Sequence, residues 1–163
     1  MIKNHTENNS NDHINAMRKA FEHRAVWFGL LVEEAKKRGL DTSFARDAIT
    51  RCGCMDGEFK YDPACTDIAE FAKIFATDDI KKIFDMDAAV DGDTLTCEFH
   101  YCPLVTAWQR LGYDDATIAE LCDIAMDGDR AIAAKNPHMT FALGETIGAG
   151  GDKCVAKFQL KKE

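Results

Sequence analysis

Apolar residues recur at three- and four-residue steps in the first half of the chain, which is the spacing of one face of an amphipathic helix. We expect helices over residues 12–38, 43–51, 67–76 and 78–85. Gly39 lies where a helix C-cap belongs, and Asp41 can cap the second helix. That helix is expected to stop at Gly53, with a loop over residues 53–65. The first half of the chain is therefore predicted to be helical.

The second half alternates between strand and helix periods. We expect a hairpin over residues 86–90 and 94–102, helices over 103–111 and 116–135, and a second hairpin over 139–143 and 154–160. The glycine-rich residues 148–152 are interpreted as the second hairpin's turn, since no phosphate-loop lysine or helix follows them. The predicted fold class is α+β, in which a helical N-terminal half packs on a four-stranded, mostly antiparallel sheet made of two hairpins joined by helices.

The predicted organisation is one domain. The chain has 163 residues, which suits a single unit with its own core. Polar residues 1–11 are expected to be a flexible tail, and residues 12–163 a single α+β domain. Within it, residues 12–85 form the helical part and residues 86–163 the hairpin–helices–hairpin part.

Charge and hydropathy exclude several classes of partner. The formal net charge is −8 at pH 7, with no basic block, which argues against binding nucleic acid. The longest apolar stretch, residues 25–32, is far shorter than the roughly 20 residues needed to span a membrane. The N-terminus does not resemble a secretory signal, so a cytoplasmic protein is expected. Because apolar residues surround most of the first helix at residues 25–32, it is a candidate surface for homo-oligomer formation.

Seven cysteines are many for a protein of this size. Their odd number and the expected compartment argue against a disulfide framework. Each is therefore a small hydrophobic residue of the core, a metal ligand or a nucleophile.

Candidate chemistry is concentrated on the predicted strand over residues 94–102. Side chains alternate across a strand, so Glu98, His100 and Cys102 are expected on one face. A thiol beside an imidazole that a carboxylate orients is the arrangement that nucleophilic thiol catalysis requires. Cys102 also directly precedes Pro103, where helix amides would favour the thiolate.

Two alternatives stay open at this point. His100 and Cys102, together with Cys54 or Cys122, offer nitrogen and sulfur ligands for zinc or iron. The second alternative is that the chain is a non-catalytic domain that binds a small molecule. In the thiol-dependent interpretation no cofactor is expected.

The helix predicted over residues 116–135 places Cys122, Met126 and Asp129 on one stripe. A carboxylate on an apolar stripe needs a partner, so Asp129 is a candidate for binding a cationic substrate group. Asp127 and Arg130 lie three residues apart and are most simply an ion pair.

Several short motifs resemble those of the L-2-amino-thiazoline-4-carboxylic acid hydrolase family. They are Cys102-Pro103, Ala107-Trp108, Leu111-Gly112, Leu121-Cys122-Asp123-Ile124 and Gly151-Asp152-Lys153-Cys154, with residues 23–27, 34–39 and 51–54 of the N-terminal half. The resemblance covers most of the chain. It implies a hydrolase that opens the C–S bond of a cyclic isothiourea to give N-carbamoyl-L-cysteine.

The resemblance and the residues together give each candidate a role in a thiol-dependent hydrolase. Cys102 is expected to be the nucleophile, His100 the general acid and base, and Glu98 its orienting carboxylate. Asp129 or Asp127 would bind the amidinium, in a substrate site that also includes Cys122. Arg110 or a helix N-terminus would bind the substrate carboxylate.

Overall fold

The computed structural model describes residues 1–6 and 11–161. Its helices are α1 (Asp12–Lys37), α2 (Ser43–Phe59), α3 (Ile68–Phe75), α4 (Asp78–Phe84), α5 (Pro103–Arg110), α6 (Asp115–Ala125), α7 (Asp127–Lys135) and the short 3₁₀ helix η1 (Ile147–Ala149). Its strands are β1 (Met86–Asp91), β2 (Thr94–Phe99), β3 (Met139–Leu143) and β4 (Cys154–Leu160). The α+β prediction with a helical N-terminal half is confirmed.

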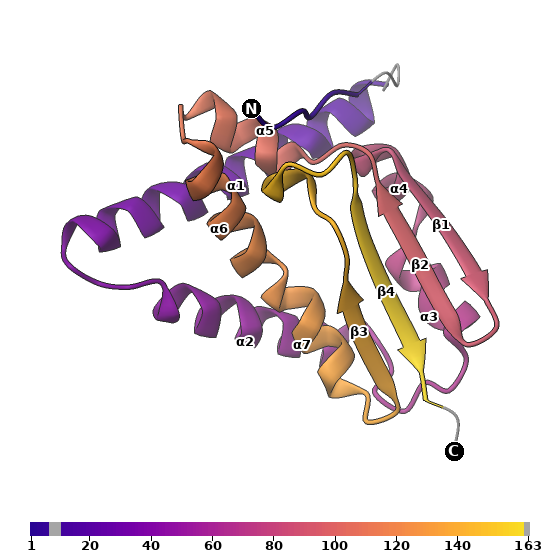
Figure 1. Cartoon of the computed structure of the whole chain (residues 1–163). Coiled ribbons are helices and arrows are strands. Elements are labelled where there is room, and N and C mark those ends of the chain that lie inside the picture. Colours follow the sequence, from indigo (N-terminus) through magenta and orange to yellow (C-terminus); the bar gives the residue numbers. More distant parts are fainter. Residues whose placement is uncertain (7–10, 162–163) are drawn as a thin grey trace.

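The four strands form one antiparallel sheet in the order β1-β2-β4-β3. The two predicted hairpins are β1–β2 and β3–β4, and they meet where β2 pairs with β4. Leu95 and Cys97 of β2 are fully buried, while Thr96 between them is not. This alternation gives the sheet one face toward the helices, where α3 and α4 lie behind the strands in Figure 1.

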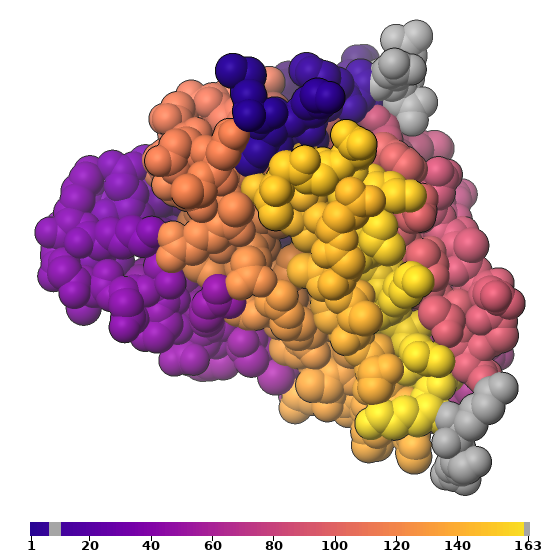
Figure 2. All heavy atoms as spheres, viewed as in Figure 1, coloured from indigo at the N-terminus to yellow at the C-terminus, as the bar shows by residue number. Residues whose placement is uncertain are grey.

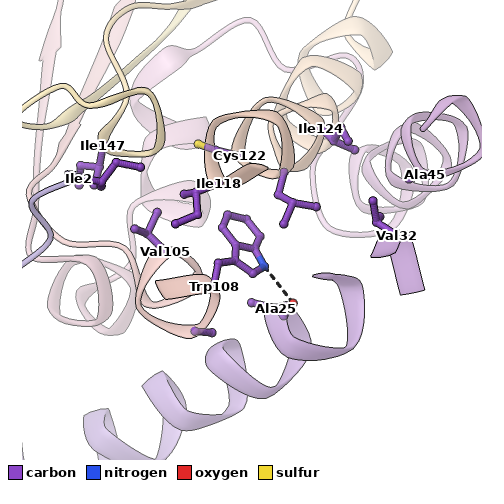
Figure 3. Packing of buried hydrophobic residues seen from close by; sticks show 12 residues of the cluster. Ile2, Ala25, Val32, Ala45, Val105, Trp108, Ile118, Cys122, Ile124 and Ile147 are labelled. Carbon is purple, nitrogen blue, oxygen red and sulfur yellow. Dashed lines mark hydrogen bonds between the residues drawn. The ribbon is translucent and has the colours of Figure 1, made fainter. Parts of the chain in front are cut away.

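Two hydrophobic clusters hold the helices to this face. One surrounds Trp108 of α5, whose indole N–H donates to the backbone oxygen of Ala25 at 3.0 Å, and it joins α1, α5 and α6 (Figure 3). The other surrounds Phe158 of β4, against which Phe71 and Phe75 of α3 pack with ring centroids 5.0 and 4.7 Å away. Between these two clusters lies the space that the candidate site occupies.

The prediction for α2 is wrong at its C-terminal end. The helix does not stop at Gly53 but continues to Phe59, so the expected loop over residues 53–65 begins only after it. Gly53 and Gly57 are buried against α7, and a Cβ atom on Gly53 would lie 2.2 Å from the backbone oxygen of Gly128. The two glycines are therefore helical despite their low propensity, because they let α2 and α7 approach closely.

We expect Gly53→Ala to lower the free energy of unfolding by about 2–3 kcal/mol, because the added methyl forces α2 away from α7. Urea unfolding followed by circular dichroism measures this effect. Thr50→Ala on the exposed side of α2 is the matched control and should change stability by less than about 0.5 kcal/mol. Equal effects of the two variants would contradict the close approach at Gly53.

The single helix predicted over residues 116–135 is two helices, α6 and α7, separated at Met126. The N–H of Arg130 still donates to the backbone oxygen of Met126 at 3.1 Å, so α7 starts almost where α6 ends. The stripe of Cys122, Met126 and Asp129 therefore still faces one side.

Residues 1–6, which we expected to be part of a flexible tail, pack on the domain. Ile2 is buried in the cluster around Trp108, and Asn4 is buried against the start of α5. Figure 2 shows these first residues in indigo against the neighbouring chain segments. Residues 7–10 of the predicted tail lie outside the described residues.

Helix α1 buries one face and exposes another. Ala25, Gly29 and Val32 are buried, whereas Trp27 and Leu31 are more than half exposed. Homo-oligomer formation through this exposed face stays a prediction. None of the helices in the described ranges is long and apolar enough to cross a membrane.

Candidate active site

A cavity of about 290 Å³ lies between the covered face of the sheet and the helices. Side chains from α1, the end of α2, α3 through α7, and strands β2 to β4 line it. Its walls are largely apolar and include the aromatic side chains of Phe21, Tyr61, Phe75, Phe84, Phe99 and Trp108. This size and lining are typical of sites that bind small molecules.

Three thiols, those of Cys102, Cys122 and Cys154, line one end of the cavity. Cys102 lies between β2 and α5 and is the N-cap residue of α5. Cys122 projects from α6 toward the segment that carries Ile147 (Figure 3), and Cys154 starts β4. The backbone N–H of Ile147 donates to the Cys154 sulfur at 3.2 Å. We call the end of the cavity that these three thiols line the thiol end.

Burial favours the neutral form of all three thiols. Burial raises the pKa of Cys102 to about 12, and burial also raises the pKa values of Cys122 and Cys154. The amides of Leu104 and Val105 and the charge of Arg24 act in the opposite direction on the pKa of Cys102. Cys102 combines the amides at the N-terminus of α5 with a nearby guanidinium, and both favour its thiolate. The amide of Gly148 and the charge of Arg130 act in the same direction on Cys122.

Asp129 of α7 lines the same cavity, and the described residues offer it no hydrogen-bond or ion-pair partner. Burial raises the pKa of Asp129 to about 6, although Arg130, Arg24 and Lys60 lower it. Its side chain is half-buried and lines the cavity. An unpaired carboxylate in such a place is prepared to receive a cation.

Charged side chains mark the cavity's rim. Arg24, Asp56 and Lys60 line the cavity and are also exposed to solvent. The Arg24 guanidinium lies over the ring of Phe21, with its central carbon 4.7 Å from the ring centroid. Arg24 lowers the pKa values of both Cys102 and Asp129, so its charge acts on the thiol end and on the carboxylate.

Glu98 and His100 do not join Cys102. Strand β2 ends at Phe99 and the backbone bends at His100, so the alternation on which the shared face depended stops there. Glu98 pairs with Lys153 at 2.7 Å, and the ring Nε2 of His100 lies 3.1 Å from an exposed Asp87 oxygen. Neither lines the cavity, which corrects the predicted Glu98–His100–Cys102 arrangement.

Of the predicted substrate-binding residues, some line the cavity and others form ion pairs outside it. Asp129 and Cys122 line the cavity with Cys102, as the stripe on the predicted helix suggested. Asp127 instead pairs with Arg46 at 2.9 Å and with Arg130 at 2.6 Å, and Asp123 pairs with the same two arginines. Arg110 pairs with Glu22 outside the cavity. Asp127 and Arg110 therefore act between helices and not in the cavity.

The alternative metal site does not assemble as predicted. Cys54 lies on α2, His100 faces Asp87, and Cys102 faces the cavity. Over residues 1–6 and 11–161, no three His, Cys, Asp or Glu side chains are placed to hold a metal ion together.

Sequence reasoning missed Cys154, Arg24 and Lys60 as cavity residues. Cys154 falls in the same alternation along β4 as the buried residues Ala156, Phe158 and Leu160, and this period was the signal available for it. Arg24 and Lys60 come from α1 and the end of α2, and only the packing of these helices brings them to one rim.

Asn4 fixes the backbone of Cys102. Its side-chain amide donates to the Cys102 backbone oxygen at 2.8 Å, and its side-chain oxygen accepts from the Cys102 backbone N–H at 2.8 Å. The N-terminal segment therefore holds the thiol end in place.

We expect Asn4→Ala to lower the free energy of unfolding by about 1–3 kcal/mol, because it removes the acceptor of the Cys102 N–H, whereas the Cys102 oxygen still accepts from Thr106. Chemical unfolding measures the loss. Lys3→Ala, at the exposed neighbouring position, is the control and should leave stability nearly unchanged. If the two variants unfold alike, the segment does not hold Cys102.

Fold and cavity together define a small α+β protein with a partly enclosed, largely apolar cavity. The family model described as L-2-amino-thiazoline-4-carboxylic acid hydrolase matches residues 18–158, and the chain belongs to this family. The resemblance seen in the sequence is thereby confirmed.

Among solved structures, the chain is similar to a trafficking protein particle complex subunit 3 from Naegleria fowleri, a crystal structure described as covalently bound to palmitic acid. The identity is 16% and the TM-score 0.55, with 89% of this chain and 97% of that chain covered. At this identity the likeness shows the fold alone. The comparison with curated proteins gives no match.

Proposed function

We propose that the chain is a hydrolase that opens an amino-thiazoline-type ring by thiol-dependent catalysis in this cavity. One observation carries the proposal: a thiol at a helix N-terminus, Cys102, and an unpartnered carboxylate, Asp129, line the same enclosed space. Membership of the family supports the reaction class.

The substrate's charges suit the cavity. Its protonated ring is an amidinium-like cation, which pairs with Asp129 and makes the ring carbon between nitrogen and sulfur electrophilic. Arg24 and Lys60 at the rim offer cations for the substrate carboxylate, in place of Arg110. The substrate thus lies between Asp129, the rim and Cys102.

The first step is ring opening. The Cys102 sulfur forms a bond to the electrophilic carbon, the ring C–S bond breaks, and the released sulfur takes up the proton that the thiol gives up. Arg24 and the amides of Leu104 and Val105 stabilise the developing thiolate. The product of this step is an isothiourea joined to Cys102.

The second step is hydrolysis. Water adds to the same carbon, the bond to Cys102 breaks and restores its thiol, and the urea group of N-carbamoyl-cysteine forms. Asp129 accepts the proton that the cation releases, a role that its pKa of about 6 suits. In this scheme Asp129 takes the proton-transfer role first assigned to His100.

The test is hydrolysis of 2-amino-thiazoline-4-carboxylate by the purified protein. Ring opening releases a thiol, which a chromogenic disulfide reports, and mass spectrometry detects the addition of one water. The product is expected to accumulate with Cys52→Ser as with the unmodified protein, since Cys52 is exposed on α2. No product under any condition at which the protein is folded would refute this proposal.

A further inference from the structure

Much of the cavity wall would find no apolar group to contact in a small polar substrate. Beyond Asp129 and the thiol end, the walls come from Phe75 of α3, Ile80 and Phe84 of α4, Phe99 of β2 and Leu143 of β3. These side chains offer no hydrogen-bonding group. They can contribute to binding only by excluding water from an apolar surface.

The size of the cavity also indicates a ligand larger than a small polar ring. A volume of about 290 Å³ has room for on the order of 10 water molecules, since each occupies roughly 30 Å³ in the liquid. An amino-thiazoline carboxylate is one small ring with two polar substituents. Bound at Asp129 and the rim, it would leave the aromatic walls in contact with water or a void, so these walls would contribute nothing to binding.

The polar groups fix where an apolar group would lie. Arg24, Asp56 and Lys60 are at the solvent-exposed rim, and Asp129 is in the cavity within range of the charges of all three. A cationic head at Asp129 therefore leaves its apolar substituent facing the walls from α3, α4 and β2. A long chain would exceed this volume, whereas a phenyl or branched alkyl group fits it.

We propose that the substrate of this cavity is amphipathic, with an amidine-type cationic head at Asp129 and a compact hydrophobic body against Phe75, Phe84 and Phe99. This deepens the proposed function, on which it rests for the reaction at the head group. It extends the substrate class from a small polar ring to a ring or amidine bearing an aryl or alkyl substituent.

The test is calorimetric titration of the full chain with a series of non-hydrolysed probes, acetamidine, butanamidine, hexanamidine and 4-phenylbutanamidine. Affinity should rise about fourfold for each added methylene until the cavity is filled. The neutral amides of equal length should bind at least about tenfold more weakly, because they lack the charge that Asp129 pairs with. An affinity independent of chain length would overturn the inference.

Variants that fill part of the cavity test whether the probes bind there. Ala125 lines the cavity, so Ala125→Phe should remove the gain with chain length, whereas Ala134→Phe on the exposed side of α7 should not. Near-ultraviolet circular dichroism checks that both variants are folded. The series on the unmodified protein decides the question even if Ala125→Phe fails to fold.

The result separates this inference from the proposed function. Chain-length-dependent binding without hydrolysis of the thiazoline supports the amphipathic ligand and contradicts the catalytic proposal. Hydrolysis with equal affinity for every probe supports catalysis and contradicts the hydrophobic body.

Discussion

Cys102→Ser is expected to lower kcat for ring opening by at least about 1,000-fold, because a serine hydroxyl neither ionises under the influence of Arg24 and two amides nor leaves the second intermediate readily. The side chain is nearly isosteric, so the fold and substrate binding should persist. Initial rates from the thiol-release assay, with KM determined separately, measure the effect.

The control is Cys52→Ser, which makes the same change on the exposed side of α2. It should retain activity within about twofold. A Cys102→Ser variant with near-normal kcat would mean that water attacks the ring directly and that Cys102 is only part of the wall.

Asp129→Asn is expected to lower kcat/KM by at least about 100-fold, because the variant loses the partner of the cationic ring and the acceptor of its proton. The unmodified protein should lose activity as pH falls through about 6, where the carboxylate protonates. Without substrate, the same variant should nevertheless be more stable than the unmodified protein at pH 7.5, because an ionised carboxylate in this cavity is costly.

The sign of the stability effect follows from the two pKa values. The folded-state pKa of Asp129 is about 6, above the ordinary value of 3.8, so the folded state binds the proton more tightly. The ionisation penalty is absent below the unfolded-state pKa and grows until pH passes about 6. We expect a stabilisation on the order of 2 kcal/mol at pH 7.5 that has largely disappeared near pH 4.

Asp127→Asn is the matched control two residues away. Asp127 pairs with Arg46 and Arg130, so its replacement should destabilise the protein at pH 7.5, opposite in sign to Asp129→Asn. Urea unfolding at both pH values measures the two variants. If Asp129→Asn is destabilising at pH 7.5, the carboxylate supports the fold and is not held ready for a ligand.

Local sequence patterns were enough to predict most elements of the fold. Alternation and turn residues predicted both hairpins, and the three- and four-residue spacing of apolar residues predicted α1, α3 and α4. The error at Gly53 arose because helix propensity describes an isolated helix, whereas Gly53 lies against the backbone of Gly128, more than 70 residues away in the sequence. No local pattern reports such a contact.

The site was only partly predictable for a related reason. The period of a helix correctly placed Cys122 and Asp129 on one stripe, and the N-cap position correctly singled out Cys102. The expected neighbours Glu98 and His100 depended on the strand continuing to Cys102, but its regular alternation ends at Phe99. Arg24 reaches the cavity only through the packing of α1, which the sequence does not encode locally.

The measurement that most directly tests the central claim, a single cavity in which Asp129 receives a cation beside the Cys102 thiol, is site-resolved alkylation. 2-Chloroacetamidine forms a bond from sulfur to carbon and releases chloride, as does the neutral 2-chloroacetamide. Peptide mass spectrometry at pH 7.5 gives the rate at Cys102 relative to exposed Cys52 in the same sample.

The account predicts that the cationic reagent favours Cys102 over Cys52 at least about tenfold more than the neutral reagent does, and that Asp129→Asn abolishes this preference. Equal preference for both reagents, or a preference that survives Asp129→Asn, would contradict it.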